Sequence, residues 1–236
     1  MLQAHKAKED AVKRSNTPLN TPAPPAPKEA APQRTESLTQ ATASGSACVS
    51  SSLLNNDSQV IKPLDQIIRL DKVAGETADT IGKIWTDYHA NKDVLSAVIP
   101  ADSYRQLYRR SKLYPRFVFP VPHGEGMEVY YAQFHFHQCF FTPLLEFKTH
   151  GESAKPYLTL THYIDLLADK GIVLMRGERT DSKTPLSMTN AQYLALALQQ
   201  FYLIGSEAKQ KLVEDFNVRP HEFDFERVVA EANKLD

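Results

Sequence analysis

The chain lacks aromatic residues over its first third. Among its 236 residues, no Phe, Tyr or Trp precedes Trp85. Residues 1–59 instead hold six prolines and a run rich in Ser and Thr from Thr35 to Ser52. Such a segment cannot bury enough apolar surface to offset the entropy lost on ordering it. We therefore expect residues 1–59 to form a disordered tail and residues 60–236 to form a single folded domain of ordinary size.

The chain also lacks an excess of charge, a pair of structural cysteines and a long apolar run. Its net charge of −1 gives no electrostatic reason to expect binding to nucleic acid or to an anionic membrane. Cys48 lies in the expected tail and Cys139 in the apolar middle, so we expect no structural disulfide, as suits a reducing compartment. No apolar run approaches the roughly 20 residues that span a bilayer, so we expect no membrane insertion.

The first residues are a poor match to a mitochondrial presequence. Such peptides are rich in Arg and Ser, amphipathic and poor in acidic residues. Met1–Ser15 is rich in lysine, but Glu9 and Asp10 interrupt the pattern. We interpret this segment as the end of a polar helix that would lie downstream of a true presequence.

Apolar periodicity in the first part of the expected domain indicates a helix followed by strands. Thr77 can cap a helix over Thr77–Tyr88, which carries one apolar stripe, and Val94–Ile99 is a β-branched strand ending at Pro100. Strand signals then dominate from Arg116 to Glu178. The stretch Met127–Lys148 is too long for one strand and predicts a hairpin turn near His137–Gln138.

The last third of the chain reads as helical. Thr189 and Gln192 predict a capping box before a helix over Tyr193–Ile204, which is apolar nearly all round and so should be buried and central. Ser206 and Asp224 are suitable caps for two further helices. The pattern predicts an α+β fold, with a mostly antiparallel sheet in the middle of the chain packed with N- and C-terminal helices.

One cluster of residues has the composition of a metal site. In an extended strand His135, His137 and Cys139 would share one face, and two histidines with a cysteine are plausible zinc ligands. A structural site needs a fourth ligand, which no Cys-x-x-Cys or second histidine pair supplies, so ordinary sheet histidines are the preferred interpretation. A metal-dependent hydrolase using these three residues is the competing function.

The middle strands carry a surplus of aromatic residues on both faces. Two arrangements remain open: helices cover both faces, or one face stays exposed as a partner surface. Under the second arrangement we predict that the partner-binding residues are Phe117, Phe119, Phe134 and Phe136. A ligand-binding α+β domain with a closed apolar pocket and no chemistry is a third possibility.

Several ordered motifs resemble one known family. They are Lys170–Met175 and Phe216–Phe223, together with Asp93–Ala101 and Ile84–His89. With these motifs in the same order over roughly residues 64–233, the chain resembles the mitochondrial F1 ATP synthase assembly factors. His135 and His137 are not part of this resemblance.

The resemblance implies a chaperone without catalytic residues or cofactors. Family members are expected to bind the free β subunit of F1 in the mitochondrial matrix, prevent its aggregation and hand it to the α subunit. Such a role requires an apolar surface with a polar rim and an affinity below that of α–β assembly. No motif of the family places the client-binding residues, so the four phenylalanines rest on the aromatic surplus alone.

Overall fold

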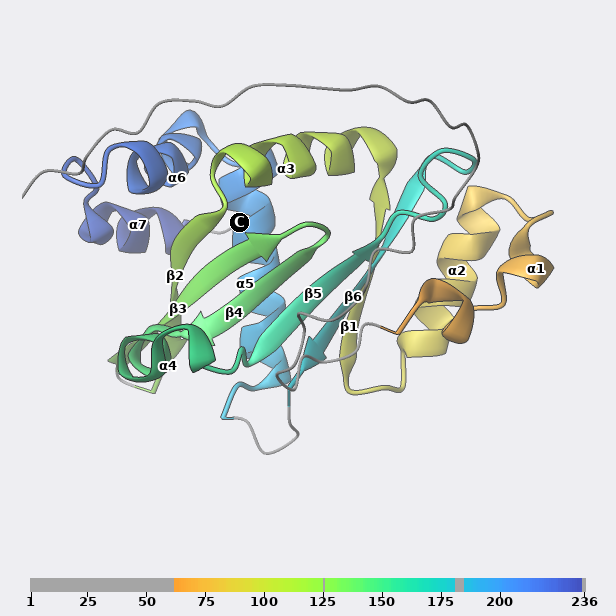
Figure 1. Ribbon diagram of the computed structural model, residues 1–236, viewed down its shortest axis with the longest axis horizontal. Coiled ribbons are helices and arrows are strands. Elements are labelled where there is room, and N and C mark those ends of the chain that lie inside the picture. Colours follow the sequence, from red (N-terminus) through yellow and green to blue (C-terminus); the bar gives the residue numbers. More distant parts are fainter. Residues whose placement is uncertain (1–61, 125, 181–184, 235–236) are drawn as a thin grey trace, which may run out of the picture. The chain divides into compact units, whose positions relative to one another are not determined.

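The computed structural model describes residues 62–124, 126–180 and 185–234, and the tail expected at residues 1–59 lies outside them. A six-stranded antiparallel sheet in the order β1-β6-β5-β4-β3-β2 forms the centre of this part (Figure 1). The predicted α+β class and the antiparallel sheet are confirmed. The strands are β1 (Val94–Pro100), β2 (Arg116–His123), β3 (Gly126–His135), β4 (Gln138–Pro143), β5 (Leu158–Tyr163) and β6 (Ile172–Arg179).

Helices precede, interrupt and follow these strands, and none of those in the described residues is long and apolar enough to cross a bilayer. The α-helices are α1 (Leu70–Val73), α2 (Ala78–His89), α3 (Ala101–Leu113), α4 (Leu144–His150), α5 (Met188–Gln199), α6 (Glu207–Val218) and α7 (Phe225–Ala232). The shorter elements are the 3-10 turns η1 (Leu64–Gln66) and η2 (Gly151–Ser153), and the π-helical η3 (Gln200–Ile204), which continues α5.

Side-chain caps fix where the helices begin. Thr77, Ser206 and Asp224 each accept a backbone N–H of the first turn, as predicted. The capping box predicted at Thr189 is wrong, because Ser187 accepts the Asn190 N–H and α5 begins two residues earlier, at Met188.

One face of the sheet carries the larger core. There α5 lies along the sheet, with α3, α6 and α7 around it (Figure 1). Phe117 and Phe119 of β2 point to this face and pack against Phe201 with ring centroids 5.4 and 5.7 Å apart. Phe216 of α6 packs on Phe117 at 5.6 Å. The surplus of aromatics on this face therefore fills the space between sheet and helices.

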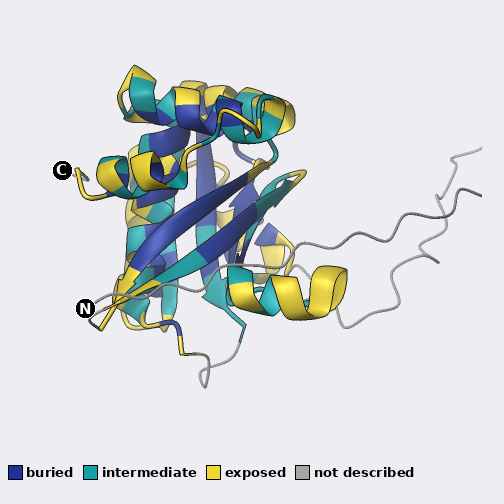
Figure 2. Ribbon diagram, turned by 90° about the vertical axis from the view of Figure 1, so that its left-hand side faces the viewer, coloured by how far each residue is buried: buried dark blue, intermediate teal, exposed yellow. Residues whose placement is uncertain are grey.

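The opposite face carries a second core and a further helix. Trp85 of α2 is fully buried there, and its indole N–H donates to the Met175 carbonyl at 3.2 Å. At the other end of this face α4 packs on β3 and β4, where Phe147 meets Tyr131 at 4.5 Å between ring centroids. Figure 2 shows helices on both sides of the buried sheet. Of the two arrangements left open by the sequence, the structure has the one with helices on both faces.

We predict that Phe117 and Phe136 respond oppositely to truncation. Phe117 is fully buried and Phe136 is 72% exposed. Phe117→Ala should lower the free energy of unfolding by about 3–5 kcal/mol, because it removes a ring from a packed core. Phe136→Ala should change it by less than about 0.5 kcal/mol.

Urea unfolding followed by circular dichroism measures both values. Equal effects of the two substitutions would contradict the burial of Phe117 and the exposure of Phe136.

Candidate functional site

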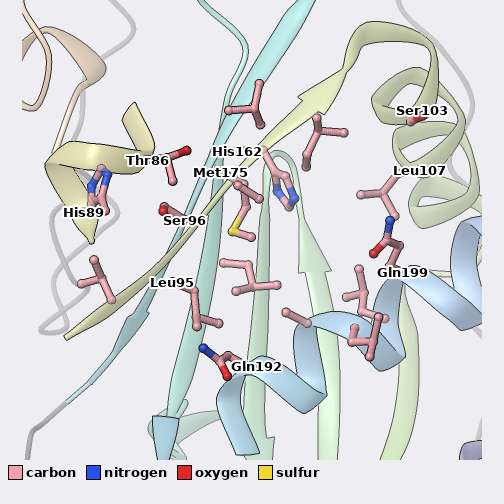
Figure 3. Close-up of a pocket in the computed structure, with 18 of the residues that line it drawn as sticks. Thr86, His89, Leu95, Ser96, Ser103, Leu107, His162, Met175, Gln192 and Gln199 are labelled. Atoms are coloured by element: carbon pink, nitrogen blue, oxygen red, sulfur yellow. The ribbon is translucent and has the colours of Figure 1, made fainter. Parts of the chain in front are cut away.

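A groove with a volume of about 630 Å³ runs between the edge strand β1 and the helix α5 (Figure 3). The C-terminal end of α2 closes it on the far side of β1, and the start of α3 closes one end. Residues 94–100 of β1 all contribute to its lining. The groove thus follows an edge strand along its whole length.

Apolar side chains from two elements form the walls. Leu95, Ala97 and Ile99 alternate along β1 toward α5, and all three pack against the larger core. Across from them, Leu196 is 39% exposed and Ile204 is 63% exposed, although both are large and apolar. A helix that is apolar nearly all round was predicted to be central. One side of α5 is buried as predicted, and another side lines the groove.

A π-helical turn shapes the end of the groove that Ile204 lines. The Gly205 N–H donates to the Gln200 carbonyl at 2.8 Å, five residues back, so the chain bulges at η3. A Cβ at position 205 would overlap that carbonyl, so only glycine fits there. The bulge sets where Leu203 and Ile204 project into the lining.

The two histidines in the lining are held neutral. His162 donates from Nδ1 to the His137 carbonyl at 3.1 Å, and burial lowers its pKa from 6.5 to about 4. His89 donates from Nδ1 to the Trp85 carbonyl at 2.8 Å, and burial lowers its pKa as well. Both side chains therefore enter the groove without charge at neutral pH.

The charges of the described lining lie at one end of the groove. Lys92 and Asp93 are the charged residues there, and they precede β1. Asp93 pairs with Arg179 of β6. Figure 3 shows Gln192 and Gln199, two uncharged amides, on the α5 side. The remaining walls are apolar or neutral, so the groove suits an uncharged, largely apolar ligand.

The three residues of the competing metal-site hypothesis do not come together. The hairpin turn falls at Phe136–His137, so His135 and Cys139 belong to different strands and do not share one face. His135 is exposed, whereas Cys139 is buried and burial raises the pKa of its thiol well above the usual value. His137 shares a hydrogen bond between its Nδ1 and the Tyr104 hydroxyl, 2.8 Å apart. Across residues 62–124, 126–180 and 185–234, no three His, Cys, Asp or Glu side chains form a group suited to a metal ion.

The four predicted partner-binding phenylalanines occupy three environments. Phe117 and Phe119 have no exposed surface and cannot contact a partner of the folded chain, which corrects their assignment to a surface. Phe134 is half-buried against Tyr202, with ring centroids 5.0 Å apart. Phe136 is 72% exposed at the tip of the β3–β4 hairpin, with a positive φ of 50°. Partner binding by Phe134 and Phe136 stays a prediction.

Sequence reasoning did not identify the groove. Its walls come from β1 and α5, about 100 residues apart, and periodicity does not reveal which strand lies at an edge. Two signals were available. Tyr193–Ile204 is apolar all round, which is more than a helix buried on one side requires, and the family motif Asp93–Ala101 contains all of β1.

Comparison with known proteins gives consistent matches. A family model described as "ATP11 protein" matches residues 1–229. "ATP synthase mitochondrial F1 complex assembly factor 1" from Homo sapiens is 38% identical over 170 residues, covering 72% of this chain and 51% of the human protein. The Danio rerio protein of the same name is 39% identical over 172 residues, covering 72% of this chain and 56% of its own length. "Protein atp11, mitochondrial" from Schizosaccharomyces pombe is 37% identical over 145 residues, covering 59% of this chain and 50% of its own length. The chain thus spans about half the length of these curated relatives.

We predict that the stability of the fold falls in weak acid because of His162. Its folded-state pKa of about 4 lies below the usual 6.5, so the unfolded chain takes up the proton first as the pH falls. The contribution to the free energy of unfolding is complete above pH 6.5 and is lost as the pH falls toward 4, by on the order of 3 kcal/mol. His162→Asn should flatten this part of the stability profile, measured by urea unfolding between pH 4 and pH 7.5.

His135→Asn is the matched control, because His135 is exposed at the end of β3. It should leave the profile unchanged. An identical slope in wild type and His162→Asn would show that His162 does not carry the effect.

Proposed function

Because this chain belongs to the ATP11 protein family, we propose that it is a non-enzymatic assembly chaperone of the mitochondrial F1 ATP synthase. Its client is the free β subunit, which it protects from aggregation and hands to the α subunit. It acts in the mitochondrial matrix and uses no cofactor. The relatives named as F1 complex assembly factors support this role, and the word mitochondrial in the names of the relatives supports the compartment.

The observation that carries the proposal beyond family membership is the groove between β1 and α5. A β subunit that has not yet met α exposes apolar surface, which the chaperone must cover reversibly. The groove offers an apolar surface with polar residues at its ends and rim, as protein interfaces do. Leu196 and Ile204 are both large apolar residues exposed within it, and neighbouring exposed apolar residues are typical of a partner surface.

Phe136 is a second proposed contact. It lies at the tip of the β3–β4 hairpin and is largely exposed. Exposed large aromatics commonly act as anchors in interfaces. Together with Phe134 below it, Phe136 retains the role predicted from the sequence, whereas the client surface no longer includes Phe117 and Phe119.

The first test is capture and release with the full chain. We expect immobilised full-length protein to capture purified F1 β subunit but not α, and added α subunit to release β. Light scattering should show that the chain suppresses aggregation of free β. Failure to capture β would refute the client assignment, and capture of β that α cannot reverse would refute the hand-over.

A substitution in the groove tests its role in capture. Ile204→Glu places an unpaired charge in the apolar lining, so we expect β-subunit affinity to fall at least about tenfold. The matched control is Leu113→Glu. Leu113 is also a large aliphatic residue, its exposed fraction is 68% against 63% for Ile204, and it lies outside the groove. Circular dichroism checks that both variants fold.

Equal affinity of the two variants for the β subunit would show that the groove does not bind the client. A fall for Leu113→Glu alone would place the interface on the exposed side of α3 instead.

A further inference from the structure

The two edges of the sheet are built differently. At the β2 edge, the Asn217 side chain of α6 accepts the Arg116 N–H at 3.3 Å and donates to the Arg116 carbonyl at 2.7 Å. Backbone groups of alternate residues point the same way in an antiparallel strand, so Val118, Pro120 and Pro122 also face this edge. The two prolines have no N–H to offer. The β2 edge is therefore closed to a further strand.

The β1 edge has no such protection in the described residues. The Ala101 N–H donates to the Gly171 carbonyl, next to β6. This bond shows which residues of β1 direct their backbone N–H and C=O groups toward β6. Leu95, Ala97 and Ile99 thus direct their backbone groups to β6. Val94, Ser96 and Val98 direct theirs outward, and no backbone partner is present for these three among the described residues. A row of donors and acceptors remains along this edge, with Pro100 at its end.

The groove lies beside this row and fits the side chains of an added strand. Side chains of a strand paired with β1 would alternate between the two faces of the sheet. One set would enter the apolar space between β1 and α5, lined by Ala195, Leu196 and Leu203. The other set would lie near Thr86 and Ala90 at the end of α2. A strand is thus the one extended element that would use the edge and the groove together.

The charges of the site restrict the segment that can bind. In the described lining, Lys92 and Asp93 lie at the beginning of β1, and Asp93 is already paired with Arg179. Beside the rest of the strand the lining is apolar or neutral. A charged side chain in the incoming segment would lose its hydration without gaining a partner. The complementary segment is therefore extended and uncharged, with apolar residues at alternate positions.

We propose that β1 binds an extended, uncharged segment of the client as an added edge strand, with alternate side chains of that segment seated between β1 and α5. This inference rests on the proposed chaperone function and specifies how the client is held. Backbone pairing supplies affinity, and the groove selects apolar side chains at every second position. The β2 edge takes no part.

Amide hydrogen exchange by NMR tests this pairing residue by residue. In the free full-length chain, the amides of Val94, Ser96 and Val98 should exchange rapidly, whereas Leu95, Ala97 and Ile99 should be protected by β6. On addition of purified F1 β subunit, exchange at the first three should slow at least about tenfold. The second three serve as internal controls and should stay protected throughout.

The outcomes separate this inference from the proposed function. Capture of the β subunit without slowing at Val94, Ser96 and Val98 would overturn strand addition and leave the chaperone role standing. Absence of capture would refute the chaperone role itself. If Val94, Ser96 and Val98 exchange slowly in the free chain and the rate depends on protein concentration, a second copy of the chain occupies the β1 edge. If the slow exchange does not depend on concentration, a segment of the same chain occupies it. Either result would overturn the proposal.

A proline substitution provides an independent test. Ser96→Pro removes an outward N–H while leaving every hydrogen bond to β6 intact, as Pro100 does at the end of the same strand. We expect it to weaken β-subunit binding about tenfold. Ser96→Ala removes the hydroxyl but keeps the N–H, and should bind like wild type.

Unfolding in urea establishes whether Ser96→Pro is folded. If it is not folded, the amide exchange rates of the unsubstituted chain decide whether a strand pairs with β1. Equal affinity of a folded Ser96→Pro and Ser96→Ala would contradict strand addition.

Discussion

The packing of Phe117 and Phe119 of the sheet against Phe201 of η3, which continues α5, is the interaction on which the other features of this fold depend. It fixes how far α5 stands from the sheet and along which line it runs. The same helix then passes beside β1, where its exposed apolar side chains become one wall of the groove. Phe216 and Phe223 extend the packing to α6 and the chain beyond it, with ring centroids 4.9 Å apart. Because α6 is anchored there, Asn217 reaches the backbone of β2 and closes that edge. One apolar cluster therefore positions both the open edge and the closed edge.

Local patterns in the sequence were sufficient to predict most of the helices and strands. They were insufficient to predict which faces of these elements are buried. The helix α2, the strand β1 and the caps at Thr77, Ser206 and Asp224 depend on neighbours in the sequence, and they were predicted. The helix α4 was missed because Leu144–His150 follows strongly β-forming residues without a break in apolar character. The burial of Phe117 and Phe119 depends on which face of the sheet α5 covers, and this is decided by contacts between residues far apart in the sequence. Alternation along a strand gives the two faces but does not say what packs on each.

Two of the motifs that carry the family resemblance, Lys170–Met175 and Phe216–Phe223, have structural roles. In Lys170–Met175, Gly171 adopts φ of 69° and Lys170 donates to the Ala74 carbonyl at 2.7 Å, so the turn into β6 is tied to the chain before α2. In Phe216–Phe223, Arg219 pairs with the buried Asp215 at 2.6 Å and Phe223 joins the aromatic core. A buried carboxylate held in this way stabilises the corner between α6 and α7 and offers nothing to a partner. The groove, in contrast, includes residues of the other two motifs, because Asp93–Ala101 contains the whole of β1 and Ile84–His89 supplies Thr86 and His89 to the lining.

An open strand edge beside an apolar groove is normally a hazard, because it invites pairing with any exposed strand. Two helices border that edge here. Residues of α5 and of the end of α2 both line the groove that contains β1, so a strand added to β1 would lie beside these two helices. The length of β1 limits affinity, since β1 spans seven residues and only alternate ones face outward. Backbone pairing over so short a length tolerates many sequences and releases readily, whereas a large subunit interface holds more tightly. Under the proposed function, such a site would hold the free client and yield it to a partner that buries more surface.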